Sequence, residues 1–155
     1  MLPRNLDKID RKIVAALQNN NRISAGELCD EIGLTLATCH RRLRRIRESG
    51  IIIKETAIID PRLNAYPLMV IIEIYLAKNR AALEEQLSSL KELSMCWAVS
   101  GPADFVAVGN FRDIYHFRKF TVAELIDNDH VKEHRSTVVV EHIRFNLEME
   151  ILEPA

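Results

Sequence analysis

The sequence of 155 residues has few cysteines, no long apolar run and almost no net charge. Its three cysteines, Cys29, Cys39 and Cys96, are odd in number and far apart, which excludes a disulfide scaffold and predicts reduced thiols in the core. They form no CxxC pair and the five histidines form no HExxH motif, so we expect no metal. The longest apolar run, residues 67–72, is broken by Glu73, and the start of the chain has no apolar secretory segment. These absences predict a cytoplasmic protein that makes no contact with a membrane.

The composition is that of a folded protein, with 48% hydrophobic and 28% charged residues. Its net charge of −1 hides two regions of opposite sign. Residues 1–60 carry eleven basic and eight acidic side chains, whereas residues 61–155 carry ten and fourteen. The regions meet at Asp60 and Pro61, where proline restricts the preceding residue and a linker can begin. We predict three segments: a domain over 1–60, a linker over 61–67 and a domain over 68–155.

Signals that start and end helices follow one another through the first region. Asp7 is suited to cap a first helix, because its carboxylate can accept from the free amides of the first turn. An apolar stripe at spacings of four residues follows it: Ile9, Ile13 and Leu17. Ser24 and Glu27 form a capping box, which predicts the start of a second helix that ends at Gly33.

A third helix is predicted from its cap, Thr35, to about Ser49. At about 100° per residue its buried face consists of Cys39, Leu43 and Ile46. The opposite face is strongly basic, because five arginines lie between residues 41 and 47 with no acidic residue among them. Two helices joined by a glycine turn and braced by a preceding helix are typical of a helix-turn-helix, whose second helix enters the DNA major groove. We place this motif at residues 25–44.

The exposed face of the third helix supplies the candidate DNA contacts. Its small N-terminal residues leave room to approach the bases, and its arginines suit phosphates or base edges. The candidates are Ala37, Thr38, His40, Arg41, Arg42, Arg44 and Arg45. Alternatively, the arginines form a solvated face or pair with acids such as Asp30 and Glu31. His40 lies at the edge of the buried face, which favours a packing role or a phosphate contact.

The second region alternates strands and helices. Strands are predicted at 68–76, 95–99, 105–111 and about 131–147, and helices at 81–90 and about 113–126. The order βαββαβ is that of the ferredoxin-like unit, whose two helices cover one face of the sheet. The other face carries apolar side chains that need a partner, and a homodimer formed through the sheets would cover them. Such a dimer would present two DNA-reading helices to a pseudo-palindromic site.

Four stretches of the chain resemble the Lrp/AsnC family of transcriptional regulators: LDKIDRKIVAALQNNNRIS, ELCDEIGLTLATCHRRLRRIRESGII, AIIDP and VSGPADF. The resemblance covers nearly the whole chain and rests on their combination. It implies an α+β protein with an N-terminal three-helix winged helix-turn-helix domain and a C-terminal ferredoxin-like βαββαβ sandwich domain. The C-terminal domain would sense an amino acid or similar small effector, without a cofactor. The resemblance also implies a homodimer that assembles to an octamer and binds double-stranded promoter DNA.

The same resemblance places the effector between dimers, near the loop after the second strand of the sensing domain. The candidate effector-binding residues are Ser100, Gly101, Ala103, Asp104, Asp113, Thr137, Val138 and Val139. Gly101 lets backbone amides approach a carboxylate, and Asp104 can accept from a ligand ammonium group. The alternatives are a tight turn at Gly101 and a turn or capping hydrogen bond at Asp104.

Together these patterns predict a sequence-specific DNA-binding regulator, not an enzyme, whose assembly or DNA affinity is tuned by the effector. Two alternatives stay open. Siroheme decarboxylases resemble the same family, and the residues that would serve such an enzyme are His116, Arg118, His134 and His142. The chain has no nucleophile, paired carboxylates or phosphate loop at a diagnostic spacing. The other alternative is an architectural protein that organises DNA with little sequence preference.

Overall fold

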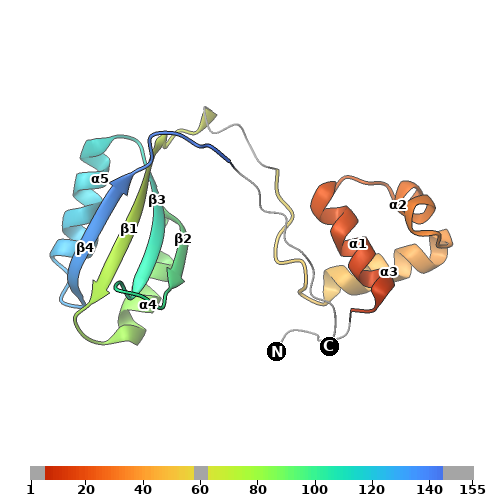
Figure 1. Cartoon of the computed structure of the whole chain (residues 1–155), viewed down its shortest axis with the longest axis horizontal. Coiled ribbons are helices and arrows are strands. Elements are labelled where there is room, and N and C mark those ends of the chain that lie inside the picture. The colour runs from red at the N-terminus through yellow and green to blue at the C-terminus, as the bar shows by residue number, and fades with distance from the viewer. Residues whose placement is uncertain (1–5, 58–62, 145–155) are drawn as a thin grey trace. The chain divides into compact units, whose positions relative to one another are not determined.

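The computed structural model describes residues 6–57 and 63–144, which divide into an N-terminal and a C-terminal unit (Figure 1). The predicted domain boundary at Asp60 lies outside the described residues, as does the predicted end of the second domain beyond Arg144. The limits of the two domains and of the linker therefore stay predictions. Within the described residues, no helix is long and apolar enough to cross a membrane.

The N-terminal unit consists of helices α1 (Lys8–Asn19), α2 (Ala25–Ile32) and α3 (Leu36–Glu48). Each begins at the cap predicted from the sequence. The Asp7 carboxylate accepts from the backbone N–H of Asp10 at 2.8 Å, and the Asp10 carboxylate accepts from that of Asp7 at 3.2 Å. Ser24 starts α2 with a second capping box, and Thr35 caps α3. All three predicted helix starts are thus confirmed.

The ends of α2 and α3 depend on glycine. Gly33 and Gly50 both have a φ of 74°, in the left-handed region that side chains with a Cβ rarely adopt. Beyond Gly50 the structure assigns no strand to residues 51–57. In this described segment, the wing that the family resemblance implies is not a β-hairpin.

The apolar stripes of the three helices meet in one core. Its buried members are Ile13, Ala16, Leu17, Leu28, Cys29, Cys39, Leu43 and Ile46. Cys29 of α2 and Cys39 of α3 interact within it: burial, and then the hydrogen bond with Cys29, raise the pKa of the Cys39 thiol to about 11. Two of the predicted core thiols are therefore confirmed. The prediction is wrong for Cys96, which is exposed because it lies on an edge strand of the sheet.

One carboxylate also belongs to this core, and it joins α1 to α3. The side chain of Asp10 is fully buried. Arg42 Nη1 donates to Asp7 at 2.6 Å and to Asp10 at 2.7 Å, and Arg45 Nη2 donates to the other oxygen of Asp10. We call these four residues the α1–α3 ion cluster. Because a buried ion pair that loses one partner leaves an uncompensated charge, the cluster stabilises the unit only while it is complete.

The C-terminal unit is an antiparallel sheet of four strands in the order β2-β3-β1-β4. The strands are β1 (Leu68–Leu76), β2 (Leu93–Ala98), β3 (Phe105–Phe111) and β4 (Val131–Val138). Helix α4 (Arg80–Ser89) connects β1 to β2, and α5 (Ile114–Thr121) with the π-helical segment η2 (Val122–Ile126) connects β3 to β4. This order confirms the ferredoxin-like α+β prediction.

Strand β4 is shorter than predicted. It ends at Val138, and residues 139–144 are not in a strand. The reason is the partner strand: Val139 N–H donates to the carbonyl of Met69, and β1 begins only one residue earlier, at Leu68. The predicted continuation through residues 145–147 lies outside the described residues.

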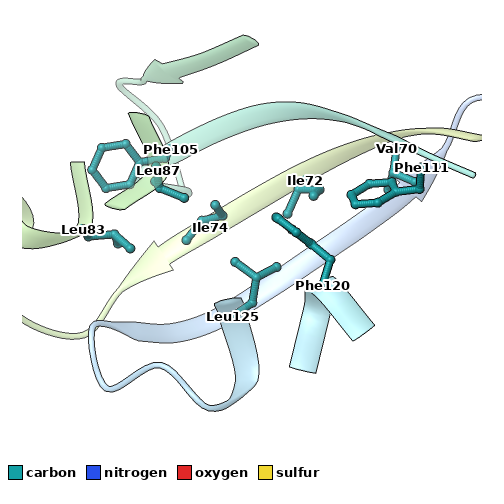
Figure 2. Close-up of a cluster of buried hydrophobic side chains, with 9 residues drawn as sticks. All are labelled: Val70, Ile72, Ile74, Leu83, Leu87, Phe105, Phe111, Phe120 and Leu125. Carbon is teal, nitrogen blue, oxygen red and sulfur yellow. The ribbon is translucent and has the colours of Figure 1, made fainter. Parts of the chain in front are cut away.

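The helices of this unit pack on one face of the sheet (Figure 2). Alternate residues of β1 point toward side chains from α4, α5 and η2, and the cluster consists of Val70, Ile72, Ile74, Leu83, Leu87, Phe105, Phe111, Phe120 and Leu125. Gly109 belongs to this face because a Cβ there would lie 2.7 Å from the buried Phe111 ring. Phe120 of α5 and Leu125 of η2 are buried in this cluster, whereas Ile114 at the start of α5 is 56% exposed.

We expect the stability that Asp7 contributes to depend on acid pH. Hydrogen bonds from Arg42 and from the Asp10 backbone lower the pKa of Asp7 from 3.8 to about 2, so the folded state binds fewer protons than the unfolded state between these values. The contribution is thus present above about pH 4 and lost as the pH falls toward 2. The wild type should unfold at a higher urea concentration than Asp7→Asn above about pH 4, and this difference should shrink as the pH falls toward 2. A difference between them that is independent of pH would contradict the pairing.

Candidate nucleic-acid interface and effector region

The exposed face of α3 carries two arginines that no carboxylate of the described residues binds. Arg41 and Arg44 are exposed, and within residues 6–57 and 63–144 neither has an ion pair or side-chain hydrogen bond. They are three residues apart, so their side chains are neighbours on the helix surface. Two such guanidinium groups, opposite the buried face formed by Cys39, Leu43 and Ile46, suit phosphate oxygens or the acceptors of guanine.

The other three arginines of α3 already have carboxylate partners. Arg42 is held by Asp7 and Asp10, and its side chain is only 19% exposed. The hydrogen bonds with Asp7 and Asp10 raise the pKa of Arg42, and their effect exceeds that of burial, which lowers it. Arg45 is held by Asp10 but is 59% exposed. Arg47 Nε donates to Glu55 at 3.2 Å.

The pairing acids differ from Asp30 and Glu31, which the salt-bridge alternative named. Sequence reasoning missed Asp10 as a partner of these arginines. A signal for its burial was available, because Asp10 lies three residues before Ile13 and seven before Leu17, on the buried stripe.

The leading end of α3 carries the small residues of the predicted interface. Ala37 is exposed, and the hydroxyl of Thr38 accepts from that of Thr35 at 2.9 Å. His40 is exposed rather than packed in the core. With Arg44 and Arg47 it lines a cavity of about 330 Å³ whose other walls are Leu17, Ile23, Ala25 and Leu43.

The predicted effector residues of the β2–β3 loop differ in their exposure and in their hydrogen bonds. Ser100 and Gly101 are exposed, and a Cβ at Gly101 would meet no atom within 4 Å. Ala103 is buried. Asp104 accepts from the backbone N–H of Leu76 at 2.9 Å and from Arg80 Nη2 at 3.1 Å. Neither contact is the turn or capping hydrogen bond of the alternative interpretation, because Leu76 and Arg80 precede Asp104 by 28 and 24 residues, and sequence reasoning missed both partners.

The remaining effector candidates lie at the other end of the sheet. Asp113 caps α5, since its carboxylate accepts from the His116 backbone at 2.7 Å. Thr137 and Val138 end β4, and Val139 bonds to Met69 of β1. By contrast, Asp104 N–H donates to the carbonyl of Ile74. Met69 and Ile74 are five residues apart on β1, which is roughly 17 Å. One chain therefore does not bring the two groups of candidates together.

The residues considered for tetrapyrrole chemistry have separate places in the fold. His116 Nδ1 accepts from the backbone N–H of Arg112 at 3.2 Å, and its Nε2 lies 3.7 Å from Glu92. His134 pairs with the inward-facing Ile74, whereas His142 lies beyond β4. In the described part of the chain, no three potential metal-binding side chains form a group.

The sheet face that α4 and α5 leave uncovered is apolar on its β2 side. The strand register places Met95, Val108 and Ile71 in one row across three strands. The next row begins with Trp97, which is 49% exposed, and Val106. It continues to Glu73 and Arg135, so the β4 side of the same face is charged. We call the uncovered apolar part, formed by Ile71, Met95, Trp97, Val106 and Val108, the open face.

Both units match families of known proteins. Residues 6–53 match the winged helix-turn-helix DNA-binding family, and residues 69–147 match the Lrp/AsnC ligand binding domain. A leucine-responsive regulatory protein from Klebsiella pneumoniae is 33% identical over 145 residues, which are 91% of this chain and 88% of that protein. The protein of the same name from Haemophilus influenzae is 32% identical over 143 residues, 90% of this chain and 86% of its own length.

Solved structures agree with these matches. A transcriptional regulator from Neisseria meningitidis, in complex with L-Met, has a TM-score of 0.84 and 27% identity, covering 94% of this chain and 97% of that one. The fold is also that of Escherichia coli AsnC, with a TM-score of 0.78, 22% identity and coverage of 97% and 99%. The two matched domains and the curated relatives show that this chain belongs to the Lrp/AsnC family of DNA-binding transcriptional regulators.

Proposed function

We propose that the protein binds promoter DNA through α3, with Arg41 and Arg44 as its main contacts, and that an amino acid or similar small effector tunes this binding. The observation that carries the DNA assignment is the division of the α3 arginines. Arg41 and Arg44 are exposed and have no carboxylate partner within the described residues, whereas Arg42, Arg45 and Arg47 are paired. A free guanidinium contributes its full charge to phosphate binding.

The other residues of the interface have supporting roles. Ala37 and Thr38 keep the leading end of α3 narrow enough to approach base edges. His40 lies next to Arg44 along the cavity and suits a phosphate contact. Arg42 acts as a positioning residue, because its contacts with Asp7 and Asp10 hold α3 on α1. Arg45 is a further contact once it is free of Asp10.

The effector site is completed by more than one chain. In one protomer, Gly101 and Asp104 lie near the end of β1, whereas Asp113 and residues 137–139 lie near its start. A neighbouring copy would bring one group to face the other, with the exposed backbone at Gly101 approaching a carboxylate. The relative from Neisseria meningitidis was solved with L-Met, which supports an amino acid as the ligand class.

In this proposal two chains form a homodimer through the open face, and such dimers assemble into an octamer. Covering Trp97, Ile71 and their neighbours removes apolar area from water, which is the main favourable term in association. We expect this assembly in the cytoplasm, where promoter DNA lies. Family membership favours regulation over enzymatic activity, and a measured ratio of specific to nonspecific affinity separates regulation from an architectural role.

Loss of the two free arginines should weaken DNA binding. For Arg41→Gln/Arg44→Gln we expect at least a tenfold loss of affinity for a promoter fragment that the protein selects from genomic DNA. The slope of log K against log salt should become shallower by about 1.8, since each lost phosphate contact removes about 0.9. Lys8→Gln/Lys12→Gln, which removes two exposed charges from α1, is the control. Equal effects of the two double variants in an anisotropy titration would refute the assignment to α3.

An effector that binds the native protein should raise its thermal midpoint in proportion to occupancy. We expect at least one of the twenty amino acids to do so. Gly101→Val should keep the ligand-free midpoint, because open space surrounds that position, but lose the ligand-dependent rise. Ala123→Val, at an exposed position of η2, should respond as the wild type does. A full response of Gly101→Val would exclude this loop from the site.

A charge on the open face should separate the protomers. Trp97→Asp places a carboxylate among apolar side chains, so its burial in a dimer would cost several kcal/mol. We expect this variant to sediment as a monomer at concentrations where the wild type is at least a dimer. Tyr115→Asp, at an aromatic residue 74% exposed on α5, is the matched control and should stay at least dimeric. A dimeric Trp97→Asp protein would place the interface elsewhere.

A further inference from the structure

We infer that Asp10, assisted by Asp7, keeps sequence-independent DNA binding low by holding Arg45 and Arg42 away from phosphates. The inference rests on the proposed role of α3 in DNA binding. It assigns to the N-cap of α1 and to an acid of its first turn a part in setting the DNA affinity of the arginines on α3.

The contacts show how firmly the acids hold these arginines. The buried carboxylate of Asp10 accepts from three donors: the Asp7 backbone, Arg42 and Arg45. Asp7 accepts from Arg42 at 2.6 Å as well. Hydrogen bonds between ionised groups are about twice as strong as neutral ones, and a buried carboxylate that loses a cation is costly. Exchange of Arg45 from Asp10 to a phosphate is therefore opposed by the charge that it would leave behind.

The position of Arg45 shows why its restraint matters for DNA. It lies one turn after Arg41 on α3, and its side chain is 59% exposed although its guanidinium is bound to Asp10. Released from Asp10, it would reach solvent at the margin of the face that carries Arg41 and Arg44. Arg42, at 19% exposed, would be released less completely.

The number of unpaired charges on α3 then sets the affinity for DNA of any sequence. Of its five arginines, three face a carboxylate, and within residues 6–57 and 63–144 the other two are left as unpaired positive charges on the exposed face. Binding that ignores sequence depends on the number of phosphates neutralised, whereas a bidentate contact of Arg41 with a base does not involve the cluster. A chain with a free Arg45 would thus bind random DNA more tightly.

The test is a mutant cycle of Asp10→Asn and Arg45→Gln, with a random-sequence duplex titrated by anisotropy over a range of salt concentrations. Asp10→Asn should raise affinity about three- to tenfold at low salt and steepen the salt slope by about 0.9, the value for one added phosphate contact. In the Arg45→Gln background, Asp10→Asn should steepen the slope much less, because only Arg42, which Asp7 still holds, then loses a carboxylate partner. Asp10→Glu, which keeps the charge, should restore the wild-type slope.

Glu31→Gln is the matched control. It removes one negative charge from an exposed position of α2 in the same unit, so it measures the general effect of net charge. Its effect should be smaller than that of Asp10→Asn and independent of Arg45. An Asp10→Asn slope equal to that of Glu31→Gln, or a gain that Arg45→Gln does not diminish, overturns the inference.

Asp7→Asn is a second variant that tests the inference if Asp10→Asn is unfolded at the temperature of the DNA-binding assay. Asparagine caps a helix as well as aspartate does, so α1 keeps its start while Arg42 loses one of its two carboxylates. The slope should steepen by less than 0.9, and only when Arg42 is present. An unchanged slope overturns the inference. If wild-type protein does not bind DNA, the proposed function fails; if it binds and the cycle shows no coupling, only the restraint by Asp10 fails.

Discussion

The N-terminal unit depends on the buried carboxylate of Asp10. The same two oxygens complete the cap of α1 and bind two guanidinium groups of α3, so one side chain fixes the start of one helix and the position of another. A buried charge with three donors is satisfied only in one arrangement, which makes the angle between α1 and α3 specific as well as stable. The cost is that two of the five arginines on the DNA-binding helix are already neutralised.

Local features of this unit could be predicted from the sequence, and distant ones could not. Caps and glycine terminators act within three or four residues, so Asp7, Ser24 and Gly33 were identified correctly. The ion cluster joins residues 32 to 35 positions apart, and a basic run gives no information on which arginine meets which acid. Only the position of Asp10 on an apolar stripe indicated that it is buried.

In the C-terminal unit, alternation and turn residues predicted the order of the strands and helices, because a period of two or 3.6 is visible in the chain itself. The predictions fail where the structure of one element depends on the element that packs or pairs with it. Strand β4 ends where β1 no longer supplies a partner. The division of the candidate effector residues into two groups at opposite ends of β1 likewise depends on how the strands pair, which alternation along the chain does not reveal.

These two groups and the open face lead to one physical conclusion about the sensing unit. A four-stranded sheet with helices on one side leaves Trp97 and Ile71 in water, and a single chain leaves the two groups of effector candidates at opposite ends of β1. The proposed association through the open face would correct both, since it removes apolar area from water and brings separate loops together. In that proposal an effector bound between chains would act on assembly directly, because its affinity would differ between the associated and dissociated states. Regulation of DNA binding would then require no conformational signal through the fold beyond a change in how two DNA-binding units are spaced.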